Sequence, residues 1–540
     1  MQVRLTMLLL ACVVLAACTR ITTQAGGPNT AANPWTAHGV LRIGGVDVPD
    51  NLNRMLGTLT VDAELSHFWC AHLLIFDDHE TMLPELALQE PTLANKGISA
   101  DGRTIVYHLR HGVNWHDGKP FTAADVIFSW QQVMNPNNLV QSRTNYDRVE
   151  NIIAPDPYTV VVHMKQPDAP FISDFFTNYC LIPKHILDGL TSINHADYNR
   201  LPIGTGAFKV AVNEPGVLVK LVANTQYWRG APKLREVDYR IIPNETTLLT
   251  EIRSHEIDFY HLASAEQTPQ FGSIPGTAVY RYPFSRFNDL GFNIAHTAVS
   301  DKRVRQALMY AIDVPKIIRV ATHGVFLRAD SDQPPWRWAH PDGLKHYDYQ
   351  PSAAAELLDA AGWRLGANNL RYKNGQPLEL LMVGVVGSPT QNAAQLVMQQ
   401  EWRAAGIDVT MKNFPNNVLY ALGSGVEQSG KFDIIYEGWT ESGDPDQLQL
   451  YGCAMAPPAG WNVYHYCNPS VDRAEAIALR NYDRDVRKRA YAVIEQANAE
   501  ELPFSVLWFV QNQDLVNSDL HGFRPGKTNS TFWNVWEWSI

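Results

Sequence analysis

The sequence predicts a large α/β protein, and three observations point to this fold class. The chain has 540 residues, 45% of them hydrophobic and 10% aromatic, which is enough to build the cores of two or three domains. From residue 40 onward, short segments with alternating apolar residues are mixed with segments whose apolar residues have helical spacing. Beyond the first 33 residues, no internal repeat and no low-complexity segment breaks this mixed pattern.

The first 33 residues have the pattern of an export signal followed by a flexible tether. An apolar run over residues 7–15 is too short to span a membrane, and small residues and Cys18 follow it. The sequence LAAC at residues 15–18 resembles a bacterial lipobox, in which residues 1–17 are removed and the sulfur of Cys18 carries lipid; the alternative is an ordinary signal with an incidental cysteine. Residues 18–33 are small and polar, and no later apolar run is long enough to cross a membrane. We therefore expect a soluble periplasmic body that is held at a bacterial membrane only by a lipid on its N-terminus.

Between residues 40 and 133 the pattern predicts strands and helices in alternation. Residues 41–43 begin a strand, and residues 62–74 have helical spacing of apolar side chains. Residues 105–109 alternate as a second strand. Thr122 is predicted to cap the helix that follows it.

A further helix is predicted after Ser300, which can serve as its N-terminal cap. Arg303 and Arg305 lie away from the apolar face of this helix, and the alternative is that they form an anion site. Trp336 and Trp338 stand in a proline-rich segment, where we expect them to line the core.

Several function classes lack their signatures in this sequence. The net charge of -11 and the absence of a basic tract argue against a nucleic-acid partner. Residues 112–119 imitate a phosphate-binding loop, but the spacing is one residue too long and Pro120 replaces the required hydroxyl. His108 and His111 would point to opposite faces of a strand, so we expect no metal site there. No Gly-x-Ser-x-Gly or His-Glu-x-x-His motif is present, and we expect neither enzyme activity nor a cofactor.

The cysteines of the mature chain predict disulfides. Apart from Cys12 and Cys18 there are four, an even number in an exported protein: Cys70, Cys180, Cys453 and Cys467. Cys453 and Cys467 flank a loop that contains proline and glycine, which makes them the better candidate pair. Cys70 and Cys180 would then pair by elimination.

Residues 432–446, FDIIYEGWTESGDPD, combine three signals in one stretch. The first residues, up to Tyr436, alternate as a short strand. The loop after it would offer Gly438, which lets another backbone approach closely, and Trp439, which has a large flat apolar face. Three acids that can pair with a cation follow, namely Glu441, Asp444 and Asp446. The stretch therefore predicts the floor of a ligand site, and the alternative is a strand followed by an acidic turn.

Segments along nearly the whole mature chain resemble the family 5 solute-binding proteins of ABC importers, a group that includes dipeptide-, oligopeptide- and nickel-binding receptors. The matching segments occur in the order of the family: ADGRTIVYHLRHGVNWHDGKPFTAADVIFSW (100–130), IGTGAFKV (203–210), IIPNETTLLTEIRSHEIDFY (241–260), DKRVRQALMYAID (301–313), AAAELLDAAGW (353–363), FDIIYEGW (432–439) and YHYCNPSVDRAEAIA (464–478). Each segment is weakly specific by itself, and the ordered set is highly specific.

The resemblance implies a two-lobed α/β receptor with the type II periplasmic-binding-protein fold of the large peptide-receptor class, which has an extra inserted subdomain. The expected boundaries are residues 34–66, 202–280 and 505–540 for lobe I, 67–201 for its inserted subdomain, and 281–504 for lobe II. The chain crossings near residues 280 and 504 would act as hinges when the lobes close on a ligand. Residues 432–446 would face the cleft.

The resemblance also implies a function. The protein would be the substrate-binding lipoprotein of an ABC importer, a monomer that captures di- or oligopeptides outside the cytoplasmic membrane and delivers them to the permease and its ATPases. Receptors of this kind bind an extended peptide backbone as a strand and hold the side chains in hydrated pockets. The nearest alternative is a receptor for a non-peptide solute, such as nickel, a metal complex or an opine- or sugar-like compound. A secreted hydrolase and a surface protein that senses or adheres are more distant alternatives.

The resemblance assigns roles to the stretch described above. In the peptide receptors a Gly-Trp pair lines the ligand, and an aspartate three residues after the tryptophan pairs with the α-ammonium. Gly438 and Trp439 match, but Ser442 stands where the aspartate is expected. Either Asp444 takes over this role, with Glu441 and Asp446 as second choices, or the ligand has no free ammonium. The predicted ligand-binding residues are Tyr436, Gly438, Trp439, Glu441, Ser442, Asp444 and Asp446.

Overall fold

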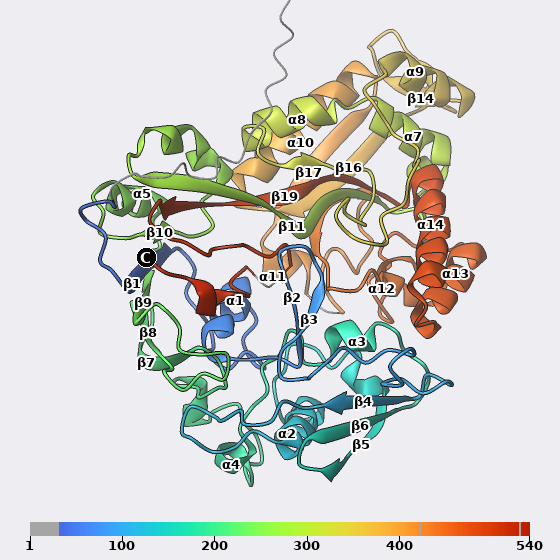
Figure 1. Ribbon diagram of the computed structural model, residues 1–540. Helices are drawn as coiled ribbons and strands as arrows, with labels where there is room; N and C mark the ends of the chain where they lie inside the picture. Colours follow the sequence, from blue (N-terminus) through green and yellow to red (C-terminus); the bar gives the residue numbers. More distant parts are fainter. Residues whose placement is uncertain (1–31, 422, 529–530) are drawn as a thin grey trace, which may run out of the picture.

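The computed structural model describes residues 32–421, 423–528 and 531–540 (Figure 1). The predicted signal, the predicted lipidation site Cys18 and most of the predicted tether lie outside these residues. Within the described residues, no helix combines the length and the apolar character needed to cross a bilayer.

The fold is organised around one large mixed sheet, as the α/β prediction requires. In the described residues its strands follow the order β17-β16-β18-β11-β19-β10-β1-β9-β8-β7, and β12 pairs with β19. The strand bounds are β1 Val40–Gly45, β7 Phe208–Glu214, β8 Leu218–Ala223, β9 Glu236–Ile241, β10 Phe259–Tyr260, β11 Thr277–Phe292, β12 Leu327–Arg328, β16 Glu379–Val385, β17 Asp408–Phe414, β18 Ile434–Thr440 and β19 Phe504–Asn517.

Two long antiparallel strands, β11 and β19, connect the two halves of this sheet. One end of β19 pairs with β10 through Val516 and Phe259, and the far end of β11 pairs with β18 through Phe292 and Ile434. The register between β11 and β19 shifts after Pro283, so the ladder is irregular midway. The crossings predicted near residues 280 and 504 fall on these two strands, and the hinge motion itself stays a prediction.

Each half of the sheet has its own covering helices. Helices α7 to α10 share one core with β16 and β18, and Figure 1 shows them grouped around that half of the sheet. Helices α13 and α14 pack against each other beside it. In the other half, α1 and the C-terminal residues pack on β1, β8 and β9. The helix bounds are α1 Thr60–Trp69, α5 Glu245–Arg253, α6 Thr297–Ser300, α7 Lys302–Tyr310, α8 Val314–Thr322, α9 Pro351–Ala360, α10 Pro389–Ala404, α11 Asn416–Leu419, α12 Leu448–Tyr451, α13 Pro469–Arg480 and α14 Arg484–Glu501.

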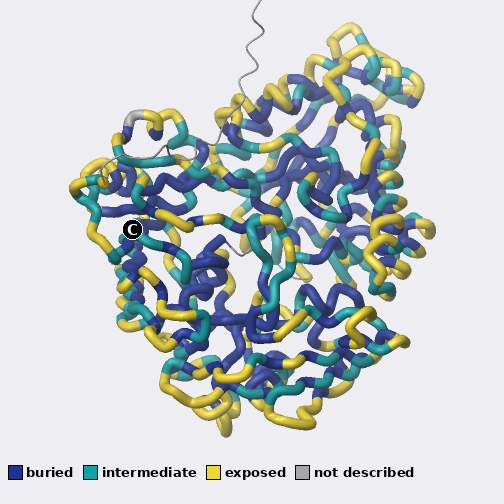
Figure 2. Tube along the Cα trace, viewed as in Figure 1, coloured by how far each residue is buried: buried dark blue, intermediate teal, exposed yellow. Residues whose placement is uncertain are grey.

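Most of the segment between α1 and β7 forms a third body with a separate core. A small sheet of order β4-β6-β5 packs with α2, and a hairpin of β2 and β3 extends from this body toward the large sheet (Figure 1). The bounds are β2 Leu74–Phe76, β3 Met82–Pro84, β4 Thr104–His108, α2 Ala123–Met134, β5 Val149–Asp156, β6 Thr159–Met164, α3 Phe171–Asp174 and α4 Lys184–Leu187, and a separate three-stranded sheet holds β13 Arg364–Leu365, β14 Arg371–Lys373 and β15 Gln376–Pro377. Figure 2 shows buried chain inside each body and exposed chain at the outer loops. The domain boundaries given above stay predictions.

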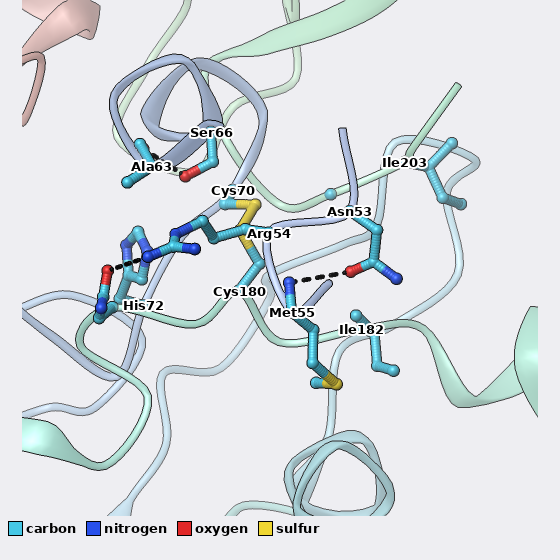
Figure 3. Close-up of a disulfide and its surroundings, with 12 residues drawn as sticks. Asn53, Arg54, Met55, Ala63, Ser66, Cys70, His72, Cys180, Ile182 and Ile203 are labelled. Carbon is cyan, nitrogen blue, oxygen red and sulfur yellow. Dashed lines mark hydrogen bonds between the residues drawn. A yellow bond between two sulfur atoms is a disulfide. The ribbon is translucent and has the colours of Figure 1, made fainter. Parts of the chain in front are cut away.

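Both predicted disulfides are present. Cys70 pairs with Cys180 and ties the end of α1 to the third body, with Arg54 beside the bond (Figure 3). Cys453 pairs with Cys467 across a separation of 14 residues.

Local sequence signals located most elements but misplaced two helix ends. Thr122 is the N-cap of α2, as predicted, and its N–H donates to Asp125 over 2.9 Å. The prediction of a helix to residue 74 was wrong, because Cys70 leaves the helical conformation and joins its disulfide partner. Ser300 is not the cap of α7, because the carboxylate of Asp301 accepts the N–H of Arg303 over 3.0 Å and takes that place.

Candidate functional site

The strand β18 carries the first half of the stretch that the sequence singled out. Gly438 and Trp439 were predicted to lie in a loop, but they lie within the strand, because Asn288 and Phe287 of β11 pair with them. A Cβ at position 438 would lie 2.7 Å from Nδ2 of Asn288 and 2.9 Å from the carbonyl oxygen of Phe287. The close approach predicted for this glycine is therefore made by the neighbouring strand.

The aromatic residues of β18 are part of the protein interior. Tyr436 has no exposed surface and packs edge-on against Trp508, with 6.2 Å between ring centroids. Trp439 is half-buried and packs edge-on against Trp461 at 5.8 Å. Both side chains therefore make aromatic contacts within the protein.

The loop after β18 lies against the third body. A Cβ on Gly443 would overlap the ring of Phe76 at the end of β2, so only glycine fits this contact. The hydroxyl of Ser173, in α3, donates to the carboxylate of Asp444 over 3.2 Å. The acidic loop therefore forms part of the boundary between the third body and the half of the sheet that contains β18.

Each predicted acid already has partners within the chain. Asp444 is buried and forms an ion pair with Arg487 at 2.6 Å. Glu441 is buried and accepts from Arg337 at 2.9 Å, and burial raises its pKa well above the ordinary value of a glutamate. Asp446 accepts the N–H of Leu448 over 2.9 Å, and burial raises its pKa too. The side chain of Ser442 is exposed and donates to the carbonyl oxygen of Asp444 over 3.1 Å.

A cavity of about 380 Å³ lies at this boundary. One wall is formed by the hairpin of β2 and β3 with the residues that follow it, including Glu80 and Glu90, and by Ser173. The opposite wall contains Asp444 together with three residues of the proline-rich segment and three residues just before or in the first turn of α14: Trp336, Arg337, Trp338, Tyr482, Arg484 and Arg487. This volume falls in the range of small-molecule sites, which are mostly apolar with a few placed polar groups.

The predicted ligand-binding residues do not all line the same cavity. Asp444 lines the cavity of about 380 Å³, whereas Glu441 and Ser442 line a second cavity of about 70 Å³, and Gly443 lines both. Tyr436, Gly438, Trp439 and Asp446 line neither of these two cavities.

Most residues of the second wall were not predicted from the sequence. Trp336 and Trp338 were assigned to the core, and they do pack against it, but both also line the cavity. Arg487 lies on the buried face of α14, one turn before Tyr491, whose hydroxyl accepts from it over 3.1 Å. A buried arginine on a helix needs hydrogen-bond acceptors from elsewhere in the fold, and the position of Arg487 among apolar residues could have been noticed in the sequence.

The two walls are joined by polar contacts. Glu80, at the tip of the hairpin, accepts from the hydroxyl of Ser285 over 3.0 Å and from Nε of Arg337 over 3.5 Å. The hydroxyl of Tyr482 donates to the carbonyl oxygen of Gly102 over 3.0 Å. These contacts hold the third body against β11, the proline-rich segment and the start of α14 in the conformation described.

Comparison with known proteins identifies the family. The sequence profile of the bacterial extracellular solute-binding proteins, family 5 (middle region), matches residues 89–456. The chain belongs to this family of solute-binding proteins. As a family 5 protein it has the two-lobed type II fold predicted from the sequence, and solved structures of similar proteins agree with this fold.

Relatives match this family 5 protein along most of their length. The oligopeptide-binding protein AppA of Bacillus subtilis is 24% identical over 550 residues, which covers 99% of this chain and 97% of AppA. A putative ABC transporter peptide-binding protein of Brucella ovis is 27% identical and 92% of each chain is covered. The crystal structure of NikZ from Campylobacter jejuni in complex with Ni(L-His) matches with 26% identity and a TM-score of 0.77, and covers 94% of this chain and 100% of NikZ.

Proposed function

We propose that this family 5 protein captures di- or oligopeptides outside the cytoplasmic membrane and delivers them to the permease of an ABC importer, without catalysing a reaction. Family membership and the end-to-end match to an oligopeptide-binding protein support a receptor of this class. The observation that carries the proposal is the cavity of about 380 Å³ between two walls that come from different bodies of the fold. A ligand held there contacts both bodies, which is how a hinged receptor couples binding to closure.

The chemistry of the cavity suits a short peptide. Trp336, Trp338 and Tyr482 offer apolar faces with polar edges, which accept varied side chains. Charged groups of both signs line the same space. In this proposal Glu441 and Asp444 position the loop after β18 through their arginine partners. Gly438 and Trp439 belong to the strand that precedes this loop and do not contact the ligand.

We also propose that the protein is a monomer attached to a bacterial membrane by a lipid on Cys18. The sequence LAAC at residues 15–18 supports this proposal. Metabolic labelling with a fatty-acid analogue should mark the wild type and not the variant Cys18→Ser, and an unlabelled wild type would contradict it.

A receptor for a nickel complex is the second candidate, because the similar structure NikZ holds Ni(L-His). Within the described residues, no group of three or more His, Cys, Asp or Glu side chains is arranged to hold a metal ion. A preformed complex needs few protein ligands, so a binding experiment must separate the two candidates.

Native mass spectrometry of the protein as purified tests the proposed function. We expect adducts whose masses match short peptides and which disappear after mild unfolding and refolding. Adducts with the isotope pattern of nickel, in place of peptides, would favour the second candidate.

A further inference from the structure

Three arginines line the cavity between the two walls, and they differ in their partners. Arg337 pairs with Glu441 at 2.9 Å, and Arg487 pairs with Asp444 at 2.6 Å. Arg484 is exposed, and it forms no ion pair with any residue that the structure describes. Its guanidinium lies over the ring of Trp338, 5.2 Å from the centroid. Stacking occupies the face of a guanidinium and leaves the N–H groups at its edge free to donate.

The opposite wall contains a carboxylate without a partner. Glu90 is half-buried, and its side chain has no hydrogen-bond donor and no ion-pair partner among the described residues. Burial raises the pKa of Glu90, and the positive charge of Arg484 acts to lower it. Both groups line the same cavity, yet no ion pair joins them among the described residues.

We propose that Arg484 and Glu90 are the two charged ends of the ligand site, which bind the carboxylate and the ammonium of a zwitterionic peptide. This inference rests on the proposed function and names the groups that select the ligand. Arg484 can hold a carboxylate through two parallel N–H donors, and Glu90 gains the cation that its partly desolvated carboxylate lacks.

The alternative acids are less suited to an ammonium. Asp444 and Glu441 already have guanidinium partners at hydrogen-bond distance, so a ligand cation would compete with those partners. Glu80 is occupied by Ser285 and Arg337. Glu90 requires no such exchange.

The location of the two groups couples charge recognition to closure. Arg484 is the first residue of α14, whereas Glu90 follows β3 in the third body. A ligand with both a carboxylate and an ammonium can bind Arg484 and Glu90 at once and so connect the two walls. A ligand with only one of these groups binds one of the two residues and therefore one wall. The receptor should therefore select for ligands that carry both termini.

Calorimetric titration with one tripeptide in three forms tests this assignment. The forms are the free tripeptide, its C-terminal amide and its N-acetyl derivative, and the variants are Arg484→Gln and Glu90→Gln. Matched controls are Arg489→Gln, which is exposed on the same helix and does not line the cavity, and Glu356→Gln, which is exposed on α9. Thermal melting of each variant confirms that it is folded.

We expect Arg484→Gln to weaken the free tripeptide by about 10- to 100-fold, as loss of a charge-assisted hydrogen bond does, and to leave the amide unchanged. Glu90→Gln should weaken the free tripeptide equally and leave the N-acetyl form unchanged, and the controls should bind as wild type. If wild type binds the tripeptide while both variants bind all three forms as wild type does, or lose them all alike, the assignment is overturned and the proposed function stands. If wild type binds none of the forms, both fail.

Discussion

The guanidinium of Arg487 lies 2.6 Å from the carboxylate of Asp444, and the two side chains are 8% and 3% exposed. This ion pair fastens the loop after β18 to the first turns of α14, two segments that are separated in the chain by all of α12 and α13. Burial works against the charge of the arginine, but Asp444 raises the pKa of Arg487 above its usual value. The pair therefore joins two distant segments in one wall of the cavity of about 380 Å³.

Asp444→Asn should destabilise the protein by about 3–5 kcal/mol, because it leaves a buried arginine without its counter-ion. Urea unfolding measures this change, and the double variant Asp444→Asn with Arg487→Met should recover part of the loss. Free and N-acetylated peptides should weaken alike, since the wall is distorted for both. A selective loss of peptides with a free N-terminus would instead show that Asp444 pairs directly with the ligand ammonium.

Gly443→Ala should weaken peptide binding, because a methyl group at this position overlaps the ring of Phe76 when the two walls meet. Overpacking of this kind costs about 1–3 kcal/mol, which corresponds to roughly 5- to 150-fold in affinity. The matched control is Gly272→Ala, at a position where an added Cβ meets nothing within 4 Å. Adding Phe76→Ala to Gly443→Ala should restore part of the affinity. Equal affinities for Gly443→Ala and the control would show that this contact plays no part in closure.

His261, directly after β10, forms a buried ion-pair network with Glu64 of α1 and Asp514 of β19. Its Nε2 lies 2.8 Å from Glu64 and its Nδ1 lies 3.1 Å from Asp514. Burial alone would lower the pKa of His261, but the two carboxylates raise it to about 10. Because this folded-state pKa is raised, the stabilisation is fully present below pH 6.5 and is lost as the pH rises through about 10.

His261→Gln should therefore destabilise the protein by about 3–5 kcal/mol at pH 6. The gap between wild type and variant should shrink by roughly 3 kcal/mol between pH 6.5 and pH 9. Urea unfolding at the two pH values measures both effects, and a gap that stays constant with pH would contradict a protonated His261.

His116 predicts the opposite pH dependence. Its Nδ1 accepts the N–H of Gly204 over 3.1 Å, so Nε2 carries the hydrogen and donates to the carbonyl of Gly206 over 3.0 Å. Burial lowers the pKa of His116 to about 4. Between pH 6.5 and pH 4, His116 is therefore protonated in the unfolded chain but neutral in the folded protein. Relative to His116→Gln, wild type should lose roughly 3 kcal/mol of stability as the pH falls from 6.5 to 4. Unfolding curves that change in parallel for the two proteins would refute this prediction.

The sequence correctly predicted structural features that depend only on residues close together in the chain. The cap formed by Thr122 and the strand around residue 105 are local, and both were placed correctly. The family resemblance supplied the fold. The extension of β18 through Trp439 depends on pairing with β11, a strand that lies far earlier in the chain, and no local pattern shows that pairing.

The cavity of about 380 Å³ was harder to predict for the same reason. Glu90 and Arg484 lie near opposite ends of the sequence and carry no motif, so only the fold brings them to one cavity. The acids of residues 441–446 were conspicuous in the sequence, but their arginine partners, Arg337 and Arg487, come from two other segments. The acidic residues indicated the region of the cavity. Which charged groups remain available to a ligand depends on the ion-pair partners that the fold brings to them.

We propose that this family 5 receptor binds peptides between the two walls of the cavity. Calorimetric titration of protein that has been unfolded, stripped of ligand and refolded tests it most directly, with a tripeptide pool and with nickel-histidine as the two titrants. We predict saturable binding of one peptide per protein and no heat from nickel-histidine. Saturable binding of nickel-histidine with no response to peptides would contradict the claim.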